Sequence, residues 1–229
     1  MEVSGSTLVD KVFNDIFDLI QSGALPLGAE VNEVALAERF SVSRGPVREA
    51  VKRLQGLGLV TKEAYMRAKV VDLSVRDLVE IFQLRESVEA MAVRLATETM
   101  SDQELDSLLA ELSDSRNGAG EMRPEFDLHV RIAEGCGNSR IRRLLQEELY
   151  YLLSIYRLRS GSLPGRRKDA YSEHWQILRA MKNRDADLAE SLMRSHIARA
   201  THSLLAALEA ENEAASSADG ARTGRRANR

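Results

Sequence analysis

The stretch SVSRGPVREAVKRLQGLGLV, residues 41–60, combines a helix start, a helix with two different faces and a helix stop. Ser43 is a good N-cap, and Pro46 is tolerated in the first turn, because backbone N–H groups there have no partner within the helix. Two sets of side chains fall on opposite sides of this helix: cationic Arg44, Arg48 and Lys52, and apolar Val47, Val51 and Leu54. The pattern predicts a helix over 44–57 that packs with one face and is cationic on the other.

The flanking sequence predicts the elements that surround this helix. Apolar residues recur at helical spacing over 7–21, and a short helix is expected over 33–40, just before the turn at 41–43. After the helix, two β-rich pieces, 59–62 and 69–73, flank a tip. We therefore expect a winged helix-turn-helix with a small β-hairpin, whose third helix enters the major groove of DNA.

Charge is unevenly distributed along the chain. The net charge of the 229 residues is −3, but residues 39–69 carry eight basic side chains and two acidic ones. A local excess of cations on an acidic chain is typical of a surface that neutralises phosphates. Charge alone leaves a solvated helix face as an equal alternative.

This part of the chain resembles the GntR family of bacterial transcription regulators. Residues 23–60 contain the family's turn, its LA-x-x-F segment, its VSR-x-PVREA recognition helix and its L-x-x-x-GLV exit. The resemblance implies DNA contacts from Ser43, Arg44 and Arg48, with Gly45 and Pro46 shaping the helix start. The cationic face adds Lys52 and the wing tip adds Arg67 as further candidates. Val34 stands where relatives often have arginine, and residues 66–68 stand where they often have glycine.

The chain after residue 73 is expected to be helical. A long helix is predicted over 74–98, and Arg85 falls on its apolar stripe. A buried cation needs a partner, which is either one of the chain's own acids or the carboxylate of a bound ligand. Residues 101–104 form a capping box that opens the next helix.

The sequence EFDLHV, residues 125–130, follows Pro124, which suits the first turn of a helix. On such a helix Glu125 and His129 are four residues apart and share a face. Asp127 lies about 200° around the helix from His129. We therefore expect Glu125 to be the partner of His129, and Asp127 to face solvent or to cap a local element.

Two more histidines, His174 and His196, occur in amphipathic segments of the same kind. Each alone is more often a hydrogen-bonded core residue than a ligand. Three histidines and a carboxylate on separate helices of one bundle, however, suit a divalent metal such as zinc, nickel, manganese or iron. His202 is expected to point elsewhere.

This half of the chain resembles the all-helical ligand-binding domain, called FCD, of FadR-type regulators. The resemblance implies metal ligation by Glu125, His129, His174 in SEHWQIL, and His196, with glutamate in place of the commoner aspartate. It also matches Asn138 to the family's GN break, and it assigns Asn138 and Arg85 to the effector cavity. Repression that is relieved by a small organic acid is the implied mode of action.

The sequence thus predicts a mainly α-helical protein with a DNA-binding domain at 1–73, an all-α effector and dimerisation domain at 74–213, and a disordered basic tail at 214–229. A single cysteine, Cys136, and the lack of an apolar run of eighteen residues indicate a cytoplasmic protein that does not span a membrane. The resemblance implies a homodimer that binds a palindromic operator. A metal-free pocket that binds a carboxylate or acyl ligand directly is the alternative, and a metal-dependent enzyme and sequence-neutral DNA binding are the two other classes of function. No HExxH helix or nucleophile elbow supports an enzyme.

Overall fold

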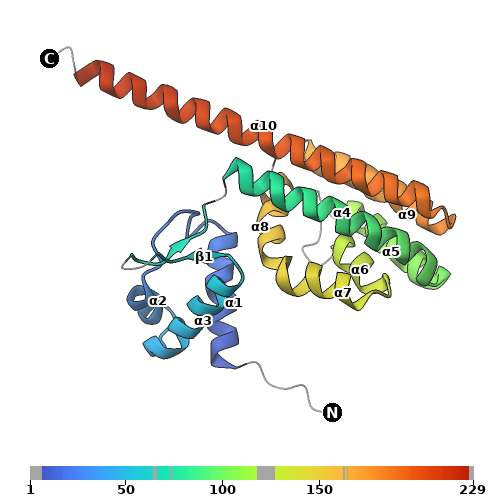
Figure 1. The fold of residues 1–229 in the computed structure, drawn as a ribbon, viewed down its shortest axis with the longest axis horizontal. Helices are drawn as coiled ribbons and strands as arrows, with labels where there is room; N and C mark the ends of the chain where they lie inside the picture. Colours follow the sequence, from blue (N-terminus) through green and yellow to red (C-terminus); the bar gives the residue numbers. More distant parts are fainter. Residues whose placement is uncertain are drawn as a thin grey trace. The chain divides into compact units, whose positions relative to one another are not determined.

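The computed structural model describes residues 7–63, 66–72, 74–117, 127–161, 163 and 165–226. Its contacts divide the chain into two compact units. One unit holds Met1–Ser74 with Glu147–Leu158, and the other holds Val75–Gln146 with Arg159–Arg229. The predicted fold class is confirmed, because the protein is mainly α-helical with one small antiparallel hairpin near its N-terminus (Figure 1).

The N-terminal unit is built on three helices, α1 (Leu8–Gln21), α2 (Glu33–Arg39) and α3 (Arg44–Gly56). Thr7 caps α1 with a complete capping box, and Asn32 caps α2 through its side-chain oxygen. Helix α3 packs against both other helices. The apolar stripes of α1 and α3 meet in the core, where seven side chains are almost fully buried: Val12, Phe13, Ile16, Val47, Ala50, Val51 and Leu54.

Two backbone turns, one between α2 and α3 and one after α3, lead the chain into the β-hairpin. Ser41 takes a left-handed backbone conformation, with φ of 55°, within the four-residue turn 40–43. Gly58, with φ of 72°, reverses the chain after α3. Strands β1 (Val60–Thr61) and β2 (Lys69–Val70) then pair antiparallel, with Val60 opposite Val70. Helix-turn-helix and wing therefore have the predicted order.

The segment Glu147–Leu158 groups with the N-terminal unit although it lies far along the sequence. It includes the start of helix α8 (Tyr150–Gly161). The ring of Tyr151 lies edge-on to Phe13 and Phe17 of α1, with centroid distances of 5.0 and 4.9 Å. Such aromatic pairs contribute beyond their buried area.

The C-terminal unit is assembled from α4 (Val75–Thr99), α5 (Asp102–Asn117), α6 (Leu128–Gly135), α7 (Ser139–Arg143), α9 (Arg166–Lys182) and α10 (Ala186–Arg226). The π-helical segment η1 (Leu144–Glu148) belongs to this unit as far as Gln146. Helix α10 packs along α4 and also against α9, while α6 packs on α4 and α5 on α9 (Figure 1). This arrangement brings α4, α6, α9 and α10 around one interior. Among the described residues, no helix is both long and apolar enough to cross a lipid bilayer.

Two predicted boundaries differ from the structure. Helix α6 begins at Leu128 rather than at Pro124, because Asp127 is extended and its side chain accepts the backbone N–H groups of His129 and Val130 as an N-cap. The tail at 214–229 was expected to be disordered, yet α10 continues through it to Arg226. The alanine- and glutamate-rich sequence that precedes the tail favours a helix, and no proline interrupts it.

The capping box of α5 gives a test of local stability. Ser101 Oγ accepts the N–H of Glu104 at 3.3 Å, and the Glu104 carboxylate accepts the N–H of Ser101 at 2.7 Å. We expect Ser101→Ala to lower the free energy of unfolding by about 1 kcal/mol. Urea denaturation followed by the fluorescence of Trp175, the single tryptophan, measures it. Ser107→Ala in the same helix is the control and should change stability by less than about 0.5 kcal/mol; equal losses in both variants would contradict the capping role.

Candidate functional site

The recognition helix presents its cationic face to solvent. The predicted DNA contacts Ser43, Arg44, Gly45, Arg48 and Lys52 are exposed, and Pro46 is half-buried. Ser43 occupies the N-cap position of α3 but makes no side-chain capping hydrogen bond. The Ser43 hydroxyl therefore makes no capping hydrogen bond that would compete with a contact to DNA.

Two of these cationic side chains form ion pairs with acidic neighbours and still remain exposed to solvent. Arg48 Nε lies 3.5 Å from Glu33, and Lys52 Nζ lies 2.9 Å from Glu49. Exposed ion pairs of this kind contribute little and separate easily when a phosphate competes.

The wing joins this surface. Arg67 pairs with Glu30 at 2.9 Å. Arg44 and Arg67, which the sequence placed on different elements, line one open hollow of about 460 Å³ together with Lys62. Arg44 of α3 and the basic residues Lys62 and Arg67 thus contribute to one candidate surface within the N-terminal unit.

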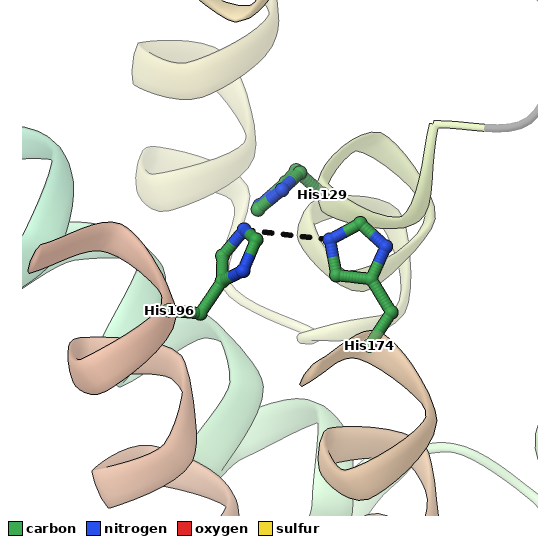
Figure 2. A group of neighbouring side chains, drawn as sticks. All are labelled: His129, His174 and His196. Atoms are coloured by element: carbon green, nitrogen blue, oxygen red, sulfur yellow. Dashed lines mark hydrogen bonds between the residues drawn. The ribbon is translucent and has the colours of Figure 1, made fainter. Parts of the chain in front are cut away.

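The C-terminal unit contains a buried cluster of three histidines (Figure 2). His129 comes from α6, His174 from α9 and His196 from α10, and each side chain is at most 7% exposed. One ligand nitrogen from each ring lies within 4.8 Å of the others. The rings point toward one another, with His174 Nε2 and His196 Nε2 separated by 3.4 Å. Among the residues that the structure describes, this is the group whose spacing suits a metal ion.

Two buried ion pairs of α4 and α9 border the cluster. On α4, Arg85 donates through Nε to Glu89 at 2.8 Å, and Glu89 contacts His129 Nδ1. On α9, Arg166 donates to Glu173 at 2.8 Å, and Glu173 lies 2.6 Å from His196 Nδ1. The alternative in which one of the chain's own acids is the partner of Arg85 is therefore observed.

The environment keeps His174 and His196 uncharged at neutral pH. Burial holds the pKa of His174 well below its usual range, and the neighbouring rings of His196 and His129 lower it further. Burial also depresses the pKa of His196, with added contributions from His129, Arg85 and Arg166. Neutral imidazole is the form that binds a metal ion.

Other predicted site residues have different outcomes. Glu125, which was predicted to share a helical face with His129, lies outside the described residues. Asn138 accepts backbone N–H groups of Arg140 and Ile141 as the N-cap of α7. His202 is exposed, as predicted.

Sequence reasoning missed three residues of the site: Glu89, Arg166 and Glu173. Glu89 follows Arg85 by four residues, so helical spacing could have identified it as the partner. Glu173 precedes His174 directly in the sequence, which gives no hint that it contacts His196 instead. Arg166 and Glu173 are seven residues apart on one helix, and nothing in the sequence distinguishes this pair from other pairs at the same spacing.

Comparison with known proteins agrees with the architecture. The profile described as "Bacterial regulatory proteins, gntR family" matches residues 8–65, and that of the FCD domain matches residues 80–199. A protein of Paenarthrobacter nicotinovorans named "Probable D-xylose utilization operon transcriptional repressor" is 31% identical over 84% of this chain and 87% of its own. The Escherichia coli transcriptional repressor GlaR is 30% identical over 71% of this chain and 80% of its own. The structure of E. coli McbR superposes with a TM-score of 0.67 at 24% identity, covering 90% of this chain and 99% of that one.

The depressed pKa values predict acid sensitivity. In the unfolded chain His174 and His196 each bind a proton below pH about 6.5, whereas in the folded chain both stay neutral to a lower pH. The free energy of unfolding therefore has its full value above pH about 6.5 and decreases as the pH falls below it. The loss is at most about 1.4 kcal/mol per pH unit for each histidine.

Urea denaturation between pH 7.5 and 5.5 in the presence of a chelator, followed by circular dichroism, measures this effect. His174→Gln should reduce the slope of stability against pH. The exposed His202 provides the control, since His202→Gln should leave the slope unchanged. A wild-type slope that persists in His174→Gln would contradict the assignment of a neutral, proton-resistant His174.

Proposed function

The chain belongs to the GntR family of bacterial regulatory proteins and carries an FCD domain, and from this premise we propose that it is a transcriptional repressor released from its operator by a small organic acid. The observation that carries the DNA-binding part is the two-faced helix α3, which is buried on Val47, Val51 and Leu54 and exposed on Arg44, Arg48 and Lys52. A cytoplasmic homodimer would place two such helices in successive major grooves of a palindromic operator.

The effector site that we propose is the histidine cluster with a divalent metal ion. His129, His174 and His196 would hold the ion, with a carboxylate from Glu125 or from Asp127 nearby as a fourth donor. Asp127 raises the pKa of His174 by its charge, against the larger lowering by burial, which supports a position close to the cluster. The ion, when bound, would supply a positive charge and open positions for an oxygen ligand.

Charge supports an anionic effector. The two buried arginines and the two glutamates beside the cluster cancel formally, and His174 and His196 are neutral. Arg199, which also contacts Glu173 at 3.0 Å, is exposed to solvent. A divalent ion held by three neutral histidines and one carboxylate would leave one uncompensated positive charge in a buried site, which is costly without an anion. A hydroxy or keto acid, which binds through a carboxylate and a neighbouring oxygen, meets both the charge and the coordination requirement.

A metal-free pocket is the second candidate. Arg85 and Arg166 lie within the same cluster, and the Nε of Arg166 has no hydrogen-bond partner among the described residues. A carboxylate or acyl ligand that paired with these arginines directly would need no ion. It would have to compete with Glu89 and Glu173, which already neutralise both.

The DNA-binding role predicts unequal effects of two arginine substitutions. On a duplex selected from random sequences by the wild-type protein, Arg44→Ala should weaken binding by about 1–3 kcal/mol, roughly 5- to 150-fold. Arg76→Ala is the control, since Arg76 pairs with Glu80 on α4, outside the helix-turn-helix. Fluorescence anisotropy at fixed salt measures both. Equal affinity of wild type and Arg44→Ala would exclude α3 as the reading helix.

The metal content distinguishes the two effector sites. We expect about one first-row metal ion per chain of tag-free protein after dialysis without chelator, lost in His196→Ala and retained in His202→Ala. Hydroxy acids should release DNA from the metal-loaded protein but not from the stripped protein. Absence of metal from the wild type, together with release by carboxylates alone, would favour the metal-free pocket.

A further inference from the structure

Two arginine–glutamate–histidine triplets of the same kind meet at the histidine cluster. The first triplet is Arg85, Glu89 and His129, and the second is Arg166, Glu173 and His196. In each triplet the arginine donates to the glutamate, and the glutamate contacts the Nδ1 atom of the histidine. The third histidine, His174, has no such carboxylate: its Nδ1 is buried and has no hydrogen-bond partner among the described residues.

The contacts of His129 determine where its proton lies. Its Nδ1 contacts the carboxylate of Glu89, which can only accept, so Nδ1 must donate. Its Nε2 lies 3.4 Å from Nη2 of Arg85, which can only donate, so Nε2 must be a bare acceptor. Both contacts require the same neutral tautomer, with the proton on Nδ1.

The contacts of His196 lead to the same tautomer. Its Nδ1 is 2.6 Å from Glu173 Oε2, a distance that requires a donated proton. The Nη2 atom of Arg166 lies farther from this nitrogen, at 3.3 Å, and the guanidinium instead donates to Glu173 through Nη1 at 2.8 Å. The Nε2 of His196 is therefore bare.

His174 must then carry its proton on the other nitrogen. Its Nε2 is 3.4 Å from the bare Nε2 of His196, and a hydrogen bond between the two needs a proton on His174. Its buried Nδ1 is then an acceptor lone pair without a partner. The opposite tautomer would bury a donor N–H that lacks an acceptor and would also set two bare nitrogens against each other.

We propose that Glu89 and Glu173 are positioning residues that fix His129 and His196 with the proton on Nδ1, so that each of these rings keeps an unprotonated Nε2, while His174 carries its proton on Nε2. The consequence for metal binding rests on the proposed function; the tautomers do not. Two histidines are ready to bind an ion through Nε2, and His174 must move its proton to Nδ1 before it can contribute the same atom. Carboxylates that hold the second ring nitrogen of a ligand orient the ring and raise its basicity.

The tautomers are measured directly in the metal-free full-length protein. Long-range ¹H–¹⁵N correlation spectra of uniformly ¹⁵N-labelled protein distinguish protonated from bare ring nitrogens, and single His→Gln variants assign the signals. We expect protons on Nδ1 of His129 and His196 and on Nε2 of His174. Adding Zn²⁺ should change the tautomer of His174 alone. A proton on Nε2 of His129 or His196 in the wild type would overturn the proposal, whatever the protein does with metal.

Metal affinity tests the positioning role. Competition between the protein and a chromophoric chelator for Zn²⁺ should show about 10- to 100-fold weaker binding by Glu89→Gln and by Glu173→Gln. Glu190→Gln on α10, where Glu190 pairs with Arg94 and Arg194 near the surface, is the control and should bind like the wild type. Circular dichroism establishes that each variant is folded.

The outcomes separate this inference from the proposed function. Zinc binding that is equal in the wild type and in folded Glu89→Gln and Glu173→Gln would overturn the positioning role and leave the metal site standing. No zinc binding by the wild type would overturn the metal site, while the tautomers measured without metal would still decide whether the two glutamates hold the rings as proposed.

Discussion

The burial of two arginines inside a helical bundle is the constraint on which the C-terminal unit depends. Arg85 is 2% exposed and Arg166 is 6% exposed, and neither charge can remain there without a partner. Glu89 and Glu173 meet this need, but a carboxylate has more acceptor positions than one arginine fills, and the remaining ones reach the histidine rings. The ion pairs thus hold α4 to α6 and α9 to α10 at the point where the rings meet. Removing one partner of a buried pair commonly costs about 3–5 kcal/mol, so these helices can shift little relative to one another at this point.

The N-terminal unit solves the opposite problem, since its charges must remain accessible. The same helical period that buries Val47, Val51 and Leu54 turns Arg44 and Arg48 to solvent, where Glu33 holds Arg48 only weakly. Ion pairs at such exposure contribute at most about 1 kcal/mol, so exchanging a carboxylate for a phosphate has a low cost. One chain therefore uses arginine in two ways: locked by burial in one unit and available at the surface of the other.

Sequence reasoning succeeded where one local rule governs one element. Helical periodicity, with the capping box at Ser101, placed α1, α4 and α5 within a residue or two, and the three histidines were identified because each lies in an amphipathic helical segment. It failed where two rules compete. A proline that suits a first turn predicted a helix from Pro124, but the side chain of Asp127 captures the free N–H groups and starts α6 at Leu128. The partners of the histidines could not be found in this way, because contacts between helices depend on how the helices are rotated about their axes.

The charge arrangement also explains why a metal ion and an acidic ligand would act together rather than separately. Without an ion, the two arginines, two glutamates and neutral histidines carry no formal excess of charge, so a carboxylate entering the site gains no net attraction and must displace Glu89 or Glu173 to reach an arginine. With a divalent ion and one carboxylate donor the same site would carry an excess of one positive charge, and an anion would be drawn in without breaking either pair. The buried pairs would then stay intact in both states, and the energy of ligand binding would be available to shift the helices that carry the histidines. A ligand can bias a conformational equilibrium only by as much as it prefers one state, and retaining the pairs avoids opposing that preference.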